Sequence, residues 1–283
     1  MTNSSTLTTE SSSQTIVITP NRGARHYWND LWNYRELFYF LAWRDILVRY
    51  KQTTIGVAWA VIRPFLTMVV FTIVFGSIAK LPSQGGAPYA ILVFAALLPW
   101  QFFSTALTDA SNSLLANASM LTKIYFPRLI IPTSTVIVGI VDFLISLAIL
   151  AGLMVWYQFV PDWKIITVPL FFLIAFVITV GAGIWLAAIN VRYRDFRFIV
   201  PFILQFGLFI TPVGFSSSVV PDQWRLLYSL NPMVGVIDGF RWAIIGGNLD
   251  WSSIIVSMSV ALFLIIIGIW YFRKVENTFA DII

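Results

Sequence analysis

Long apolar runs constrain this chain more than any other feature of its sequence. A helix needs about 20 mostly apolar residues to cross a bilayer, and only 11% of the residues are charged, against roughly a quarter in soluble domains. No run shows the short alternating pattern of a membrane β-barrel strand. The sequence therefore predicts an all-α membrane protein with six transmembrane helices, at about residues 57–79, 89–108, 129–158, 165–190, 198–214 and 253–272.

The cations are distributed unevenly among the segments that join these runs. If the N-terminus is cytoplasmic, the inner segments hold 14 of the 18 Lys and Arg residues, and the outer loops hold only Lys80, Lys164, Arg225 and Arg241. An excess of cations is typical of cytoplasmic loops. We therefore expect an integral protein of the cytoplasmic (inner) membrane with both termini cytoplasmic. The positions of the cations argue against a nucleic-acid partner, despite the net charge of +5.

Two segments precede the first apolar run. Residues 1–26 begin with a Ser/Thr-rich stretch, and this composition predicts a disordered cytoplasmic tail. They lack the apolar core of a signal peptide. Residues 27–52 carry aromatic residues at helical spacing and predict an amphipathic helix in the inner membrane interface. It is either a plain anchor or also a docking face, formed at its C-terminal end by Arg44, Asp45, Arg49, Tyr50 and Lys51.

The predicted third span contains an acidic residue, Asp142. A carboxylate at this depth must pair, take up a proton or face water. Two interpretations remain open, a purely structural pairing and a carboxylate that faces the interior of the bundle. Most of the aromatic residues in the spans are expected to pack or to face lipid. A few on an inward face would offer a weak platform for the C–H side of a sugar ring.

Residues 214–250, between the last two runs, are too long and too apolar for an ordinary outer loop. Their apolar stretches are broken at Asn231-Pro232 and Gly246-Gly247 and are too short to span a bilayer. We expect re-entrant or surface-lying half-helices, which act either as an outer gate or as a passive lid. The candidate gate residues are Trp224, Tyr228, Asn231 and Pro232.

Several kinds of chemistry lack the residues they need. The sequence contains no G-x-x-x-x-G-K-[ST] phosphate loop, no cysteine and a single histidine, His26. We therefore expect no catalytic residues, no metal site and no cofactor bound by this chain. Acidic residues within the spans are too few for a proton relay, so the energy for any transport has to come from another protein.

The link between the second and third runs, residues 115–128, is basic and aromatic. "LANASMLTKIYFPR" is compatible with a short helix that ends at Pro127. Two readings of this segment are equally supported by its residues. It is either a cation-rich inner loop or a surface that fits a shallow pocket on a soluble partner.

Several quoted stretches resemble one family in order along the chain. "WRDILVRYKQTTIGVAWAVIRP" (43–64), "LLPWQFF" (97–103), "NASMLTKIYFPRLIIP" in the link, "NVRYRDFRFIVPFILQ" (190–205), "LNPM" (230–233) and "ENTFADII" (276–283) resemble the ABC-2 type permease subunits of polysaccharide and polyol-phosphate exporters. The resemblance covers nearly the whole chain from about residue 28.

The resemblance implies a homodimer that works with two separate ATP-hydrolysing subunits, which bind ATP and Mg²⁺. It implies that the link is the coupling helix that seats in the ATPase, formed by Ser119, Met120, Lys123, Ile124, Tyr125, Phe126, Pro127 and Arg128. We expect Lys123 and Arg128 to pair with acidic groups of the ATPase, and Tyr125 and Phe126 to supply the anchor, because buried aromatic residues usually dominate an interface.

The cargo implied is a long glycan on a polyprenyl-diphosphate lipid, such as an O-antigen or a teichoic acid. We expect it to pass through a continuous channel, with contacts strong enough to guide and weak enough to release. The candidate path residues are Trp59, Trp100, Phe102, Phe103 and Asp142. The alternatives are an ABC-2 permease for a drug or small lipid, and a membrane-embedded glycosyl transferase, which would need paired carboxylates or a metal site.

Overall fold

The computed structural model describes residues 24–51, 56–83 and 85–279, and all regular structure in these residues is helical. Most of the predicted N-terminal tail therefore lies outside the described residues. The elements are α1 (Ala24–Asn33), α2 (Arg35–Lys51), α3 (Gly56–Phe71), η1 (Thr72–Ile78), α4 (Tyr89–Ala116), α5 (Ala118–Leu121), α6 (Ile130–Trp156), η2 (Trp163–Thr167), α7 (Val168–Arg192), α8 (Phe196–Ile210), η3 (Ser217–Val219), α9 (Asp222–Ser229), α10 (Pro232–Ile245), α11 (Trp251–Val275) and η4 (Glu276–Thr278).

Five of the helical segments described are long and apolar enough to cross a membrane: α3 with η1, α4, α6, η2 with α7, and α11 with η4. The sixth predicted span corresponds to α8, which is apolar but has only 15 residues. At 1.5 Å per residue it is about 22 Å long, shorter than a bilayer core of about 30 Å. The all-α membrane class is confirmed, with five candidate spans.

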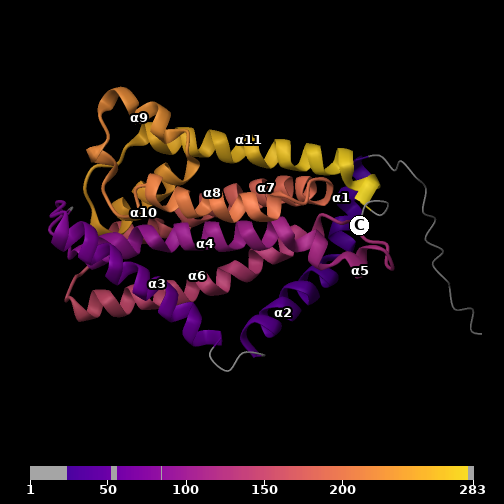
Figure 1. Cartoon of the computed structure of the whole chain (residues 1–283), viewed down its shortest axis with the longest axis horizontal. Coiled ribbons are helices and arrows are strands. Elements are labelled where there is room, and N and C mark those ends of the chain that lie inside the picture. Colours follow the sequence, from indigo (N-terminus) through magenta and orange to yellow (C-terminus); the bar gives the residue numbers. More distant parts are fainter. Residues whose placement is uncertain (1–23, 52–55, 84, 280–283) are drawn as a thin grey trace, which may run out of the picture.

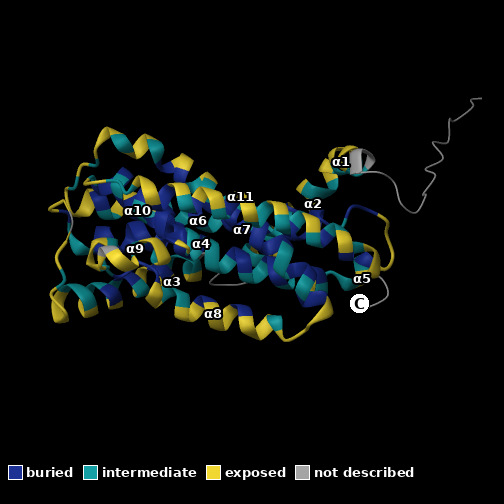
Figure 2. Cartoon of the chain, turned by 90° about the horizontal axis from the view of Figure 1, so that it is seen from above, coloured by how far each residue is buried: buried dark blue, intermediate teal, exposed yellow. Residues whose placement is uncertain are grey.

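Helix α4 lies at the centre of the bundle (Figures 1 and 2). It packs against α6, α7 and α10, and against α3 and α8 on its other side. Its most apolar stretch is 78% buried, whereas the corresponding stretches of the other spans are 17–39% buried. The exposed faces of these spans also carry apolar side chains. This is expected for helices that face lipid.

The buried residues form two separate clusters. The larger cluster surrounds α4 and includes Phe94, Phe102 and Phe240. The smaller cluster is built from α2, the segment after α5, and the ends of α7 and α11, and it includes Leu41 and Phe126. Figure 1 shows α1, α5 and the end of α11 at one end of the bundle, here called the α5 end, and α9 and α10 at the other, here called the α9 end.

The predicted interfacial helix is interrupted. Instead of one helix over residues 27–52, the structure has α1 and α2, separated by a turn at Tyr34. Tyr34 packs against the smaller core cluster, and this tertiary contact accounts for the break in the periodic pattern. Several of the aromatic side chains that predicted the helix are exposed, at Trp28, Trp32, Tyr39 and Trp43. The opposite side of α2 packs on α6.

Small residues allow the spans to approach closely. A Cβ atom added at Gly181 of α7 would lie 2.6 Å from the backbone nitrogen of Ile265 in α11, and one at Gly268 of α11 would overlap the carbonyl oxygen of Gly181. Such contacts are typical of helix pairs in membranes, where small residues let backbones meet. They hold α7 and α11 side by side along the bundle.

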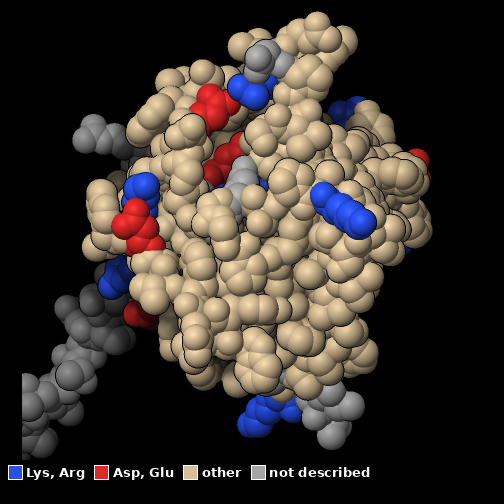
Figure 3. All heavy atoms as spheres, turned by 90° about the vertical axis from the view of Figure 1, so that its left-hand side faces the viewer, with Lys and Arg blue, Asp and Glu red and all other residues tan. Residues whose placement is uncertain are grey.

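The α9 end is closed by the short helices α9 and α10 (Figure 1). Helix α10 is largely buried and packs against α11, α4 and α7. Figure 3 looks onto this end and shows few charged side chains, scattered over an otherwise uncharged face. The predicted outer half-helices thus correspond to two real helices, of 8 and 14 residues, and their depth in a bilayer stays a prediction.

Candidate functional site

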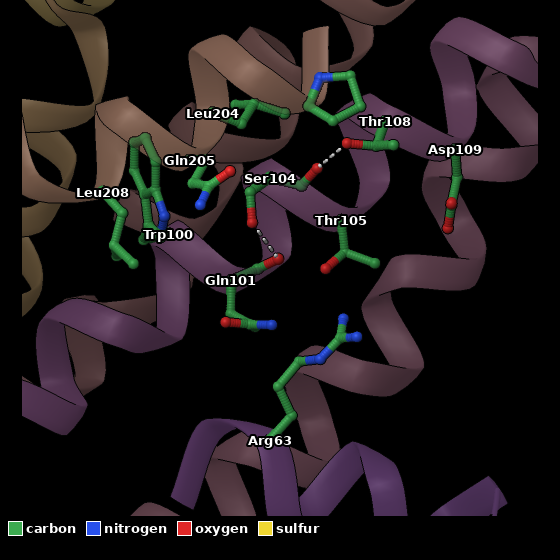
Figure 4. A pocket seen from close by; sticks show the side chains of 11 residues that line it. Arg63, Trp100, Gln101, Ser104, Thr105, Thr108, Asp109, Leu204, Gln205 and Leu208 are labelled. Carbon is green, nitrogen blue, oxygen red and sulfur yellow. Dashed lines mark hydrogen bonds between the residues drawn. The ribbon is translucent and has the colours of Figure 1, made fainter. Parts of the chain in front are cut away.

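One face of α4 carries a polar stripe within an otherwise apolar helix. Its members recur every three or four residues and therefore share one side of the helix: Gln101, Ser104, Thr105, Thr108 and Asp109. All are half-buried, while neighbours such as Phe102 and Ala106 are buried. The stripe lines a cavity of about 320 Å³, closed on the sides by Arg63 of α3 and by Leu204, Gln205 and Leu208 of α8 (Figure 4).

The members of the stripe differ in how their hydrogen bonds are satisfied. Ser104 and Thr108 donate to carbonyl oxygens of their own helix, at 3.3 Å to Gln101 and 2.8 Å to Ser104. Such bonds within the helix satisfy a hydroxyl without a partner from elsewhere. In the described part of the chain, the side chains of Gln101, Thr105 and Gln205 make no hydrogen bond. Their amide and hydroxyl groups are available to a polar ligand in the cavity.

Arg63 contributes a positive charge to this wall. Figure 4 shows its guanidinium pointing toward the stripe, on the side of Thr105. Within the described residues it forms no ion pair. A cation at this depth is costly unless it faces a polar space or a partner. Arg63 meets this requirement, because its side chain lines the cavity.

A second cavity of about 320 Å³ adjoins the first. It is lined by Arg49, Tyr50, Trp59 and Asp142 among others, and it shares Arg63, Gln101 and Thr105 with the first cavity. Because these three residues belong to both linings, we treat the two cavities as one feature and call it the polar groove. It runs between α2, α3, α4, α6 and α8.

A charged cluster ties α2 to the wall of the groove. The guanidinium of Arg49 donates to Asp142 of α6 at 2.6 Å and also pairs with Asp109 of α4. Tyr50, the next residue of α2, donates its hydroxyl to Asp142. The structural pairing of Asp142 that the sequence left open is therefore present, and the same carboxylate also lines the groove.

The environment of this cluster shifts the pKa values of two α2 side chains. Burial by itself would lower the pKa of Arg49, but the carboxylates of Asp109 and Asp142 raise it above its ordinary value. Burial and the hydrogen bond to Asp142 raise the pKa of the Tyr50 hydroxyl. Both pKa shifts keep Arg49 charged and Tyr50 neutral at physiological pH, so Arg49 acts as a cation and Tyr50 as a hydroxyl donor in the cluster.

The predicted aromatic path residues fall in different places. Trp59 is exposed and lines the groove, and Trp100 lines it from a buried position. Phe103 is half-buried and packs on Trp100, with ring centroids 5.7 Å apart. Phe102 does not reach the groove. It is 2% exposed and packs among Phe143, Phe172 and Phe176, so its assignment to the path is wrong.

The predicted coupling segment is mostly loop. After the last residues of α4 it contains the single helical turn α5, where Ser119 is exposed and Met120 is half-buried. The following residues Lys123, Ile124 and Tyr125 are exposed at the α5 end. They form the outermost part of this segment, and we call Thr122–Tyr125 the docking segment.

One of the predicted coupling contacts requires correction. Phe126 is only 3% exposed and belongs to the smaller core cluster, so it cannot serve as an anchor on another protein in this conformation. Arg128 donates to the backbone carbonyl of Glu276 and its backbone N–H donates to the Glu276 carboxylate at 3.1 Å, next to the buried Pro127. Both bonds tie Arg128 to the residue that follows α11, and its pairing with an acidic group of the ATPase stays a prediction.

At the α9 end, the candidate gate residues are tied to the end of α8. Tyr228 donates its hydroxyl to the carbonyl of Ile210 at 2.9 Å, and Asn231 donates to Thr211 at 3.1 Å. Asn231 also caps α10 by accepting from the N–H of Met233, with Pro232 in the first turn. Trp224 is exposed on α9. These contacts bring Tyr228 and Asn231 together at the end of α8.

Sequence reasoning missed two features. The first is the polar stripe of α4. Its three- and four-residue spacing is present in the sequence, but the prediction followed the neighbouring aromatic residues Trp100, Phe102 and Phe103 instead. The second is Arg241, which was counted as an outer-loop cation. Its side chain is 2% exposed and donates to three backbone carbonyls, of Phe215 at 2.6 Å, Val213 at 2.9 Å and Leu92 at 3.4 Å. No pattern in the sequence indicates such acceptors.

Comparison with known proteins places these features in a family. Residues 36–245 match the model of the ABC-2 type transporter family. The O-antigen export system permease protein RfbA of Myxococcus xanthus is 31% identical over 214 residues, which cover 75% of this chain and 81% of the relative. A protein of the same name from Klebsiella pneumoniae is 25% identical over 249 residues, 88% of this chain and 95% of the relative.

A further relative is the polysialic acid transport protein KpsM of Escherichia coli, 22% identical over 212 residues, which cover 73% of this chain and 80% of the relative. The family match spans most of the chain, from the start of α2 to the end of α10. It agrees with the resemblance carried by the sequence motifs. This chain belongs to the ABC-2 type transporter family.

Proposed function

We propose that this chain is the permease subunit of an ATP-driven exporter that moves a lipid-linked, O-antigen-like polysaccharide across the inner membrane. The observation that carries the proposal is the polar groove, a path of amide and hydroxyl groups within an apolar helical bundle. Family membership supports transport, and the relatives named for O-antigen export support the class of cargo.

Six crossings fit the chain path if α8 is the short sixth one. Helix α7 ends next to the α5 end, because Asn190 donates to the carbonyl of Ser111 near the end of α4 at 2.9 Å. Helix α8 ends at the α9 end, where Tyr228 binds its last carbonyl. The chain therefore changes ends along α8. A short crossing is tolerated where the bilayer thins or the helix is covered by protein.

The orientation we propose places the α5 end in the cytoplasm. Tyr27 of α1 donates to Glu276 at 3.2 Å, so the beginning and the end of the described chain meet at this end. The excess of cations in the segments there supports a cytoplasmic location. The docking segment then faces the cytoplasm, where a separate ATPase subunit would bind. The exposed Ile124 and Tyr125 take the place of Phe126 as its anchor.

A homodimer would complete the conduit. The groove is flanked by α3 and α8, whose outward faces expose apolar side chains such as Leu66 and Phe65 on α3 and Phe202 and Phe206 on α8. A second copy set against these faces would oppose two grooves and cover apolar surface. The paired polar stripes would form a passage wide enough for a sugar chain that is too long to be enclosed.

The chemistry of the groove suits a sliding polymer. Amide and hydroxyl groups exchange hydrogen bonds with sugar hydroxyls at little cost, and Trp59 offers a ring face at one side. Conduction requires contacts that guide without trapping the cargo. ATP binding would draw the two ATPase subunits together and move the docking segments, which changes the width of the passage.

Deletion of the gene tests this function. We expect the full-length glycan to accumulate on its lipid carrier in the inner leaflet, and the wild-type gene to restore export. The variant Gln101→Leu/Thr105→Val should restore less export, because it removes groove donors without altering the docking segment. The control Thr133→Val changes a hydroxyl of α6 that bonds to its own helix, at 2.7 Å to Leu129, and should restore export fully.

The same test addresses the alternatives. If deletion leaves lipid-linked glycan unchanged but removes resistance to a compound, the chain is an ABC-2 permease for a drug or small lipid. Accumulation of a lipid-linked polyol phosphate would indicate teichoic acid export instead. A purified chain that converts its substrate without any ATPase subunit would overturn the transporter proposal and favour a membrane-embedded transferase.

A further inference from the structure

Helix α2 contacts both the base of the docking segment and the polar groove, and it does so through two different arginines, Arg44 and Arg49. Near its middle, Arg44 donates to the side-chain oxygen of Asn117 at 2.9 Å. Near its C-terminus, Arg49 pairs with Asp109 and Asp142. One short rigid element therefore joins the start of α5 to two spans that line the groove.

The Asn117 contact reaches the base of the docking segment. Asn117 is the N-cap residue of α5, and its carbonyl accepts from Met120 and Leu121 at 3.0 and 3.2 Å. Its side chain also donates back to Ser113 of α4 at 2.9 Å. A displacement of α5 by a bound partner would therefore pull on Arg44, which is held in place by Asp45 at 2.8 Å.

Between its two polar contacts with α4, α2 borders a cavity of about 470 Å³. The cavity is lined by Arg44, Val48 and Arg49 from α2, and by residues of α4 and α6 such as Asn112 and Thr135. Helix α2 packs along α6, but it reaches α4 and its C-cap residue Asn117 through two side chains, Arg49 and Arg44. Because the cavity separates the helices between these two contacts, α2 has room for a small tilt about α6.

We propose that α2 transmits the movement of the docking segment to the polar groove, with Arg44 as its input contact and Arg49 as its output contact. This inference rests on the proposed function and goes beyond it by assigning the coupling to named residues. Arg44 and Arg49 are positioning residues, since they act on the groove walls through Asn117, Asp109 and Asp142. A contact of this kind qualifies as coupling only if both sites respond to its loss.

The test uses the complete complex of this chain with its ATPase, reconstituted in lipid. Because the chain has no cysteine, labels can be placed at Ile62→Cys of α3 and Ile203→Cys of α8, whose side chains are exposed on the two flanks of the groove. The distances between spin labels are measured with and without Mg-ATP plus vanadate. We expect a nucleotide-dependent change in the wild-type background.

Two variants break the proposed route at different points. Arg44→Gln/Asn117→Ala removes the input contact, and neither residue lines the polar groove. Arg49→Gln/Asp109→Asn/Asp142→Asn replaces the output cluster by neutral side chains of similar size, so that none of its three members keeps a charge without its partner. In both, we expect ATP hydrolysis to continue, the label distances to stop responding to nucleotide, and export per ATP hydrolysed to fall at least about fivefold.

The matched control is Arg35→Gln. Arg35 is also on α2, its contact is with the ring of Trp32 at 5.9 Å, and it lines neither the polar groove nor the cavity beside α2. It should leave the label response and the export ratio unchanged. Thermal unfolding of each variant separates coupling from folding, because the neutral output variant should unfold close to the wild-type temperature.

Each outcome decides between the claims. If either broken variant keeps the nucleotide response and the export ratio of the wild type, α2 does not carry the coupling. If Arg35→Gln abolishes the response as strongly, the effect belongs to α2 as a whole and the assignment to Arg44 and Arg49 is wrong. If the wild-type complex moves no glycan at all, it is the proposed function that fails.

Discussion

The two ends of this molecule each depend on an arginine, and the two arginines are held in different ways. At the α9 end, Arg241 is 2% exposed and all of its recorded acceptors are backbone carbonyls. Toward the α5 end, the side chain of Arg49 is 31% exposed and its partners are carboxylates. Carbonyls of the main chain cannot be repositioned without refolding the segment, whereas carboxylate side chains can change rotamer.

The difference indicates a division of roles between a fixed end and an adjustable end. Arg241 joins α10, α4 and the segment after α8 into one closed unit. The contacts of Arg49 join α2 to α4 and α6, the elements that the proposed coupling would move. We expect the α9 end to move as one rigid unit, whereas side-chain contacts within the α5 end break and form again.

The largest effect is expected at Arg241. Arg241→Met would leave three backbone carbonyls without their donor in a buried site, and it should lower the free energy of unfolding by about 3–5 kcal/mol. No second substitution can compensate, because the acceptors belong to the main chain. Thermal unfolding in detergent measures this effect. Lys80→Gln, an exposed cation on a loop at the same end, is the control and should change little; equal effects would remove the contrast between the ends.

The second effect separates the core of the α5 end from its surface. Phe126→Ala opens a cavity in the smaller cluster and should cost about 3–5 kcal/mol of stability. Tyr125→Ala changes an exposed neighbour, so stability should stay within about 0.5 kcal/mol. It should instead weaken binding of the ATPase by more than about 1 kcal/mol. Titration of the purified ATPase measures the second quantity. A stable Phe126→Ala protein that fails to bind the ATPase would restore the original assignment.

The third effect concerns the helices that connect the ends. Gly268→Ala should destabilise the bundle by about 1–3 kcal/mol, because its new methyl group meets the backbone of α7. The control Gly152→Ala lies in α6, where an added Cβ meets nothing within 4 Å. It should be neutral or slightly stabilising, since alanine favours a helix over glycine. Comparable losses in both variants would show that α7 and α11 do not depend on this close approach.

The smallest effect is expected at Arg49. Arg49→Gln leaves two carboxylates without their cation and should cost about 1–2 kcal/mol, less than Arg241→Met because the cluster is partly exposed. Adding Asp109→Asn and Asp142→Asn should recover most of this loss. The measurement is again thermal unfolding. A loss that the two asparagines fail to recover would make Arg49 resemble Arg241, and the comparison between the ends would no longer hold.

The spans could be predicted from the sequence because hydrophobicity alone determines which segments cross a membrane. Residues 89–108 and 253–272 fall within α4 and α11 as predicted. The predicted span runs past the end of α8, because Val213 and Phe215 continue its apolar run, although Pro212 and Gly214 are signals that end a helix. The turn at Tyr34 depends on a tertiary contact that leaves no local signal.

The site was predicted less completely, for a different physical reason. Composition identifies aromatic and charged residues but not the direction in which they point. Phe102 and Phe126 both looked suited to contact a ligand or partner, and both are buried. Asp142 stood out because a carboxylate in a span needs a partner, but that the partner is Arg49, 93 residues away in the sequence, follows only from the packing of α2 on α6.

The ionised side chains along the polar groove have a further consequence for selectivity. Arg49 and Arg63 contribute two positive charges, and Asp109 and Asp142 contribute two negative ones, so that the lining is electroneutral as a whole. Neither small cations nor small anions would accumulate there from the cell. In the proposed passage, this balance would offer small ions no net counter-charge, and hydrogen bonds would be the main contacts to a sugar chain.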